Sequence, residues 1–214
     1  MSSVLSLKFE GHTADSFHFE ACCQELGGEA FFAYSDIGMS SIRFVPILFT
    51  NRSGSNFVSE LVASTNEYNI ATEIFNSEEI IGTCREFGIN YFHEYISAIV
   101  TSNAINDCFF VKLGTPHLYL LEKAGFLSLF FNRQKCLWSR RANLHSQAVS
   151  FFIAEKTGAW ASYQSVKIPA LSSKDYDFSR INYFYCLIKN QESRIGSFVS
   201  SNAISCFEVG YEQL

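Results

Sequence analysis

The chain has 214 residues, of which 48% are hydrophobic and 17% charged, and its formal net charge is −5. This apolar content is enough to bury a core, so it excludes intrinsic disorder and collagen-like or coiled-coil architectures. The acidic balance gives no general electrostatic reason to bind nucleic acid or an anionic membrane surface. We therefore expect one large or two small domains, without double-stranded nucleic acid as a partner.

The start of the chain lacks the basic stretch and long apolar stretch that make a secretory signal. The longest apolar runs, 44–49 and 126–131, are far shorter than the roughly 20 residues that cross a bilayer. The chain has seven cysteines at irregular spacing and no CxxC pair, which suits reduced thiols better than a disulfide framework or structural zinc. We therefore expect a cytoplasmic protein with no membrane span and no metal.

The first half of the chain begins with a helix pattern. Phe19, Cys22 and Leu26 recur at helical spacing, and Gly27 and Gly28 follow them as a stop. Two runs rich in Phe, Ile and Val then predict an antiparallel hairpin, and Pro46 predicts an edge position or a bulge in its second strand. The expected elements are a helix over 15–26, the hairpin of 29–34 with 41–50, a helix over 78–87, strands over 91–100 and 108–113, and a short helix over 119–123.

The second half predicts a helix over 137–156, where Leu144, Ala148 and Phe151 mark one apolar face. Its further expected elements are a loop or linker over 169–174, a helix over 178–189 and a hairpin of 194–200 with 203–211. A helix that feeds a hairpin is thus expected near both ends of the chain. This repetition favours two related α/β halves, residues 1–125 and residues 126–214, of which the second is incomplete.

Three segments occur in an order that points to a known family. The first is Asp15-Ser-Phe-His18, followed by Arg43-Phe-Val-Pro46-Ile-Leu. The second, 63–69, precedes a helix over 80–89 and lacks the Pro and the two glycines of a Ser-Pro-Tyr-Gly-Tyr-like loop. The third is Leu137-Trp138-Ser-Arg140-Arg141 with 154–158. In this order the chain resembles the Fem-type branch of the GNAT acyltransferase superfamily.

The resemblance implies an α/β (α+β) fold with a GNAT-like mixed sheet and flanking helices. It also implies a transferase that moves an acyl or aminoacyl group from acyl-CoA or aminoacyl-tRNA to a small-molecule or peptide amine. Asn66 and Tyr68 would then contact the substrate. An acyl transfer of this kind needs one acceptor for the amine proton, and His18 and His145 are the candidates for it. A structural or surface role is the alternative for both histidines.

Four positive charges lie within nine residues of this otherwise acidic chain: Arg133, Lys135, Arg140 and Arg141, with Trp138 between them. Guanidinium groups match phosphate oxygens and an aromatic ring can stack on a base, so the cluster could hold a phosphate, a pyrophosphate or a tRNA backbone. The alternative is a solvated helix entry with Trp138 anchored in the core.

A non-enzymatic ligand-sensing or protein-interaction module on a degenerate GNAT-like scaffold is the competing hypothesis, and the missing loop glycines favour it. An inhibitor or immunity protein that is steered by acidic charge is a third, although a charge of −5 is ordinary for this length. The 22 Phe and 10 Tyr residues indicate either a crowded core or the apolar interface of a homo-oligomer.

Overall fold

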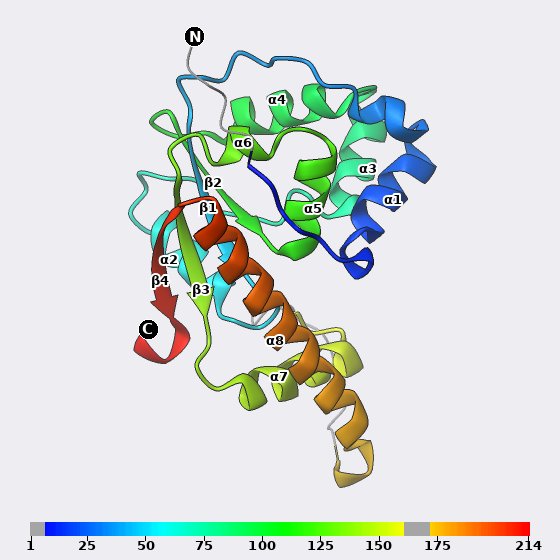
Figure 1. Ribbon diagram of the computed structural model, residues 1–214, viewed down its shortest axis with the longest axis vertical. Coiled ribbons are helices and arrows are strands. Elements are labelled where there is room, and N and C mark those ends of the chain that lie inside the picture. The colour runs from blue at the N-terminus through cyan, green and yellow to red at the C-terminus, as the bar shows by residue number, and fades with distance from the viewer. Residues whose placement is uncertain (1–6, 161–171) are drawn as a thin grey trace.

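The computed structural model describes residues 7–160 and 172–214, and a four-stranded sheet forms its centre (Figure 1). The strands are β1 (Arg43–Phe49), β2 (Cys108–Leu113), β3 (Lys135–Arg140) and β4 (Ser205–Gly210), in the order β2-β1-β3-β4. All three neighbouring pairs are parallel. The predicted α/β class is confirmed, but the predicted mixed sheet is wrong, because helices separate every two consecutive strands and bring the chain back to the same edge.

Neither predicted hairpin is formed. The run at 29–34 is a 3-10 helix, Gly28–Phe32, whose Phe31 and Phe32 rings pack on Phe92 at 5.9 and 5.1 Å. The run at 194–200 is the end of α8 (Phe178–Ser201), where Ile195 and Phe198 lie buried at helical spacing. In both runs the buried aromatic and branched side chains face the core from a helix, so their β-like composition was misleading. The repetition that suggested two related halves therefore has no counterpart in these elements.

The predicted strand at 91–100 is also wrong, since this segment is α4 (Phe92–Asn103). Its buried side chains, Phe92, Tyr95, Ile96 and Val100, follow a helical period. The Glu94 carboxylate accepts hydrogen bonds from the backbone N–H groups of Asn90 (3.1 Å) and Tyr91 (3.2 Å) at the helix start. The helical spacing of the buried side chains and the N-terminal cap therefore outweighed the β-propensity of the aromatic and branched residues.

The other predicted elements are formed with shifted boundaries. The helices at 15–26, 78–87 and 119–123 are α1 (Phe17–Glu25), α3 (Ser77–Phe87) and α5 (Thr115–Lys123), and the strand at 108–113 is β2. The predicted helix at 137–156 divides into β3 and α7 (Leu144–Thr157), which Asn143 caps by accepting a hydrogen bond from the Ser146 N–H at 3.0 Å. Of the predicted loop at 169–174, residues 169–171 lie outside the described residues.

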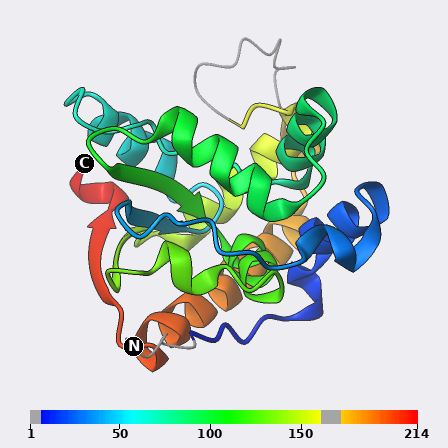
Figure 2. The same ribbon diagram turned by 90° about the horizontal axis from the view of Figure 1, so that it is seen from above.

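The helices cover both faces of the sheet, and Figure 2 shows α2 and α8 on opposite sides of it. On one face, Val58 of α2 (Ser55–Ala63) packs with Ile47 and Phe110. On the other face, Leu48 and Trp138 join the large core with α5, α6 (Leu127–Phe130) and α8. Both sides of residue 125 contribute strands to this one sheet, because β1 pairs with β3.

β1 is a central strand, which contradicts the edge position predicted from Pro46. The register of β1 with β3 runs from Ile47 to Phe49, so pairing with β3 begins after the proline. The outer edge of β2 is covered by the segment before α3. There the Asn69 side chain both accepts from the Phe110 N–H and donates to the Phe110 carbonyl, each at 2.8 Å, as a neighbouring strand would. In the described ranges, no helix is long and apolar enough to cross a membrane.

The buried carboxylate of Asp15 joins the N-terminal segment to α5 and α8. It accepts hydrogen bonds from the Thr115 hydroxyl at 2.8 Å and the His12 N–H at 3.0 Å. The Arg194 guanidinium pairs with both carboxylate oxygens. Asp15 is only 2% exposed, so its charge depends on these donors for the solvation that water would otherwise supply.

Replacing Asp15 by Ala should lower the free energy of unfolding by about 3–5 kcal/mol, because the Arg194 charge would stay partly buried without its partner. The matched control is Glu25→Ala, which removes the exposed Glu25–Arg85 ion pair and should cost no more than about 1 kcal/mol. Urea unfolding of the two variants measures both values. Equal losses would contradict the role assigned to the Asp15 pair.

Candidate functional site

The sheet topology marks one place for a ligand. β1 leads to β2 on one side, whereas β3, on the other side of β1, leads to β4. The connections after β1 and β3 therefore leave in opposite directions, and open parallel sheets bind ligands outside the carboxyl ends of the strands at such a point. The residues there are the loop 50–54 and the segment 141–143. Figure 1 shows the α7 and α8 pair extending beyond this end of β3.

The loop 50–54 is fixed from beneath by buried hydrogen bonds. The Ser139 hydroxyl at the end of β3 donates to the Ser53 carbonyl at 3.1 Å. The amide of Gln147, which is fully buried in α7, donates to the Thr50 hydroxyl at 2.9 Å and to the Asn51 carbonyl at 2.8 Å. The loop is therefore held in one conformation by β3 and α7.

This loop ends at the N-terminus of α2. Gly54, the N-cap residue, has φ of 92°, and no side chain caps the helix. The first backbone N–H groups of a helix have no partner within the helix, and together with the helix dipole they attract anions. The N-terminus of α2, with its free backbone N–H groups, thus points toward the carboxyl ends of the strands and suits an anion such as phosphate or sulfate.

Two arginines stand beside this helix end. Arg52 donates to the Ser150 hydroxyl at 3.0 Å and to the Trp160 carbonyl, and the Arg141 guanidinium lies 4.7 Å from the centre of the Tyr211 ring. In the part of the chain that the structure describes, neither has a carboxylate within ion-pair distance. The buried Nε of Arg141 has no hydrogen-bond partner there. Burial, and then the charge of Arg141, lower the pKa of Arg52. Both arginines lie near the Tyr211 ring, because Arg141 stacks on it and Gly54, two residues after Arg52, lies against it.

Arg140 differs from its neighbour. Its guanidinium donates to Glu192 of α8 at 3.0 Å and to Glu208 of β4 at 2.9 Å, and it stacks on Trp138 at 4.5 Å. Both carboxylates neutralise it, so Arg140 joins α8 to β4 and is less available to a ligand than Arg141. Trp138 is almost fully buried in the core.

The 3-10 turn Tyr211–Gln213 closes the site beside β4. The Glu212 carboxylate accepts from the backbone N–H groups of Ala142 (3.0 Å) and Asn143 (3.2 Å). These hydrogen bonds lower the pKa of Glu212. The Tyr211 ring lies against Gly54, where a Cβ atom would come within 2.5 Å of it.

A buried polar network adjoins the site at the end of β2. Lys112, 3% exposed, donates to Asn56 in the first turn of α2 and to Glu73, each at 2.5 Å. Burial would raise the pKa of Glu73, but the charge of Lys112 and the hydrogen bonds from Lys112 and Asn76 outweigh it and lower that pKa below its usual range. Glu73 is therefore an ionised carboxylate next to the N-terminus of α2.

The same network contains two stacked histidines, His18 and His117, with ring centres 5.2 Å apart. His117 accepts from the Gly114 N–H at 3.0 Å through Nδ1, and its Nε2 lies 2.9 Å from Asn76 Oδ1. Burial lowers the pKa of His117 to about 3 and also lowers that of His18. Since His18 Nδ1 accepts from the Ser77 N–H at 3.0 Å, this nitrogen is already engaged in the core.

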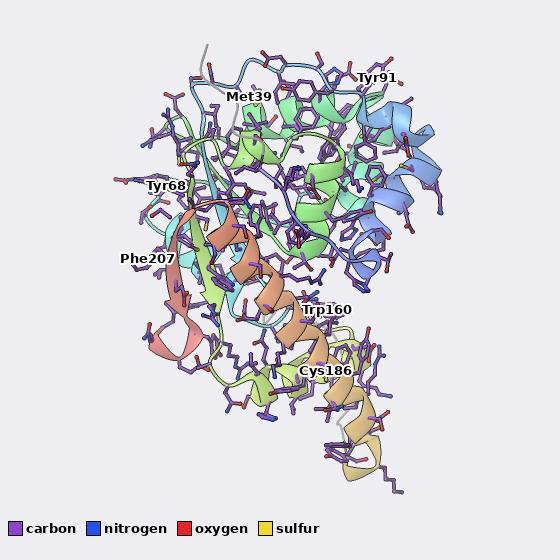
Figure 3. All side chains as sticks on the ribbon, viewed as in Figure 1. Met39, Tyr68, Tyr91, Trp160, Cys186 and Phe207 are labelled. Carbon is purple, nitrogen blue, oxygen red and sulfur yellow. The ribbon has the colours of Figure 1, made fainter. Side chains whose placement is uncertain are left out.

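The structure separates the other predicted site residues. His145 is exposed on α7 and stacks on Tyr185 at 4.7 Å. Asn66 and Tyr68 follow α2 at the amino ends of the strands, and Figure 3 shows Tyr68 well away from Trp160. Arg133 precedes β3, so it lies about 20 Å from Arg140 along a strand that rises roughly 3.3 Å per residue. Of the basic cluster, only Arg140, Arg141 and Trp138 meet at the carboxyl end.

Sequence reasoning missed Arg52, Gln147, Lys112 and Glu73. A weak signal was present, since a buried strand followed by Arg52-Ser-Gly54-Ser and a helix is a common way to present a helix N-terminus to an anion. The other three lie far apart in the chain, so no local pattern connects them.

Two open hollows, of about 500 and 740 Å³, lie elsewhere, between the segment 36–42 and α4. Neither is lined by Lys or Arg. No group of three or more His, Cys, Asp or Glu side chains that could hold a metal ion occurs among the described residues. The charged groups at the carboxyl end of the sheet therefore make the stronger candidate site.

Gly54→Ala tests the contact between the loop and the terminal turn. A methyl group at a positive φ costs roughly 1–2 kcal/mol, and here it would also displace the Tyr211 ring. In a Tyr211→Ala background the second cost disappears, so the loss on Gly54→Ala should be smaller by about 1 kcal/mol. Denaturant unfolding of the four proteins measures the difference, and equal losses in both backgrounds would place the ring elsewhere.

The free energy of unfolding should decrease as the pH falls below 6.5, because the buried His117 resists protonation in the folded protein. Its folded pKa of about 3 lies below its ordinary 6.5, so between these values the unfolded chain binds a proton that the folded one does not. The contribution is complete above pH 6.5 and is lost as the pH falls toward 3, with a slope of up to about 1.4 kcal/mol per pH unit. His117→Gln, which keeps an acceptor and a donor, should reduce this slope in urea unfolding from pH 7 to 4. An unchanged slope would refute the assignment.

No protein-family model matches the chain, and no curated protein matches it in sequence. The GNAT resemblance thus gains no support from either comparison.

Proposed function

We propose that the protein binds a phosphate-bearing nucleotide at the loop 50–54 and transfers an anionic group, phosphoryl or sulfuryl, from it to an acceptor. One observation carries the proposal: Arg52 and Arg141, without ion-pair partners in the described chain, stand beside the uncapped N-terminus of α2. The two cations repel each other, and an anion between them would reduce this repulsion further than the nearby Glu212 does. Guanidinium forks and backbone N–H groups together suit tetrahedral oxyanions.

The position of Lys112 favours transfer of a charged group over acyl transfer. Lys112 bonds to Asn56 in the first turn of α2, so it lies next to the place where the anion binds. Phosphoryl and sulfuryl transfer depend mostly on positive charge around the transferred group, which α2, Lys112 and the two arginines supply. In acyl-CoA the thioester lies a pantetheine arm away from the phosphates. Acyl transfer from acyl-CoA or aminoacyl-tRNA stays a proposal, because these donors also carry phosphates that the proposed site could bind. The charged groups of the site would then lie near the donor's phosphates and not near its acyl group.

Glu73 supplies the second half of the proposed chemistry. Its carboxylate is ionised and adjoins the anion site through Lys112. An ionised carboxylate can accept the proton of an attacking hydroxyl or amine, and Lys112 keeps Glu73 ionised while lowering its basicity. The acceptor is thus a small molecule or peptide with a hydroxyl or amine group.

Binding of nucleotides tests the proposal directly. We expect a nucleoside triphosphate, 3′-phosphoadenosine 5′-phosphosulfate or a CoA thioester to raise the melting temperature of the full chain. Arg141→Ala should weaken the best ligand about tenfold to a hundredfold, since a hydrogen bond to a charged group is worth about 1.5–3 kcal/mol. Arg133→Ala, which removes the same charge at the opposite end of β3, is the matched control and should leave affinity unchanged.

The panel also separates the donor classes. The strongest shift with a CoA thioester would favour acyl transfer, and the strongest shift with the phosphosulfate or a triphosphate would favour sulfuryl or phosphoryl transfer. Glu73→Gln should keep nucleotide affinity but lose turnover with an acceptor. Equal weakening by Arg133→Ala and Arg141→Ala, or no shift with any ligand, would overturn the proposed site.

A further inference from the structure

Cys136 and Cys206 face each other across β3 and β4. They are directly opposite in the parallel register, and their Sγ atoms are 2.8 Å apart. Both are free thiols, Cys136 buried and Cys206 partly exposed. The pair lies near the start of both strands, at the opposite end from Arg140 and Tyr211.

The backbone around this pair already has the spacing that a disulfide needs. Neighbouring strands lie about 4.8 Å apart, and disulfides join Cα atoms about 4.4–6.8 Å apart. A bond length of about 2.05 Å requires the two sulfurs to approach by less than about 1 Å. Small side-chain rotations within the paired strands can supply that movement.

The two sulfurs also differ in reactivity. Cys136 donates its S–H to Cys206 Sγ, and this hydrogen bond lowers the pKa of Cys206 and raises that of Cys136. Cys206 is therefore the thiolate that reacts first, and its partial exposure gives reagents access to it. In contrast, burial raises the pKa of Cys22 to about 12 and that of Cys84 to about 11, so these core cysteines stay protonated.

We propose that Cys136 and Cys206 are a redox modification site, which a small-molecule disulfide such as oxidised glutathione converts to an intrachain disulfide. The Cys206 thiolate attacks one sulfur of the oxidant, breaks its S–S bond and releases one glutathione thiolate. Cys136 then loses its proton to water, and its sulfur attacks Cys206 Sγ and expels the second glutathione. Two cysteine thiols are oxidised, and the oxidant is reduced to two glutathione thiols.

The cross-link would fix an edge strand. β4 pairs only with β3 among the described strands, and most of its side chains are exposed or partly exposed, as Phe207 shows (Figure 3). The bond would close a loop between positions 70 apart in the chain, which includes α7 and α8. Closing a long loop restricts the unfolded chain, so the oxidised protein should unfold at a higher temperature. This inference does not depend on the proposed function.

Oxidation of the full chain, followed by alkylation, digestion and mass spectrometry, tests the proposal. We expect one linked peptide pair containing Cys136 and Cys206, with a mass lower by two hydrogen atoms, which dithiothreitol separates again. Cys206→Ser should abolish the link, whereas Cys186→Ser, at an exposed cysteine of α8, should leave it intact.

The melting temperature gives a second readout. It should rise on oxidation of the wild type and of Cys186→Ser, but not of Cys206→Ser. A persistent mixed disulfide between Cys206 and glutathione, a link between another pair of cysteines, or a cross-link without a rise in melting temperature would overturn the proposal.

Discussion

Parallel pairing of β1 with β3 is the constraint on which the candidate site depends. Because the two strands run in the same direction, their carboxyl ends lie at one edge, and the loops that follow them meet although they are far apart in the chain. Ser53 and Ser139, 86 residues apart, bond to each other at this point. Antiparallel pairing of β1 with β3 would have put Arg52 and Arg141 at opposite ends of the sheet, so the candidate anion site depends on the topology.

Ion pairing distinguishes the buried charges of the fold from the arginines of the candidate site. Lys112, Asp15 and Glu192 are buried, and each has an oppositely charged partner: Glu73, Arg194 and Arg140, respectively. The two arginines of the candidate site differ from these pairs, because in the described chain neither has a carboxylate within ion-pair distance, and Glu212 acts on Arg141 only from farther away. Their proximity costs free energy in the absence of an anion, and functional sites are where such costs are commonly retained.

Elements such as α3 and β2 were predicted correctly, because the spacing of their apolar residues agrees with the secondary structure that their residue types favour. The prediction failed where spacing and residue type favour different structures. In α4 and in the last turns of α8, Phe, Ile and Val lie in helices because their spacing buries them, a tertiary effect that local propensity does not contain. The site shows the same division. Clustered charge predicted Arg133 and Arg141 together, but the structure places them at opposite ends of β3, and Gln147 and Glu73 reach the candidate site only because distant segments meet.

β4 connects the two chemical features of this protein. At one end it holds Cys206 opposite Cys136, and at the other it holds Glu208 on Arg140 and leads directly into Tyr211, which covers Gly54. The strand is six residues long and paired throughout with β3. Tyr211 stacks with Arg141 rather than with a core residue, and this contact is weaker than the packing that fixes the loop from beneath. Of the side chains around the candidate anion site, the Tyr211 ring is therefore the one that a ligand can displace at least cost, while Glu212 keeps the turn bonded to Ala142 and Asn143.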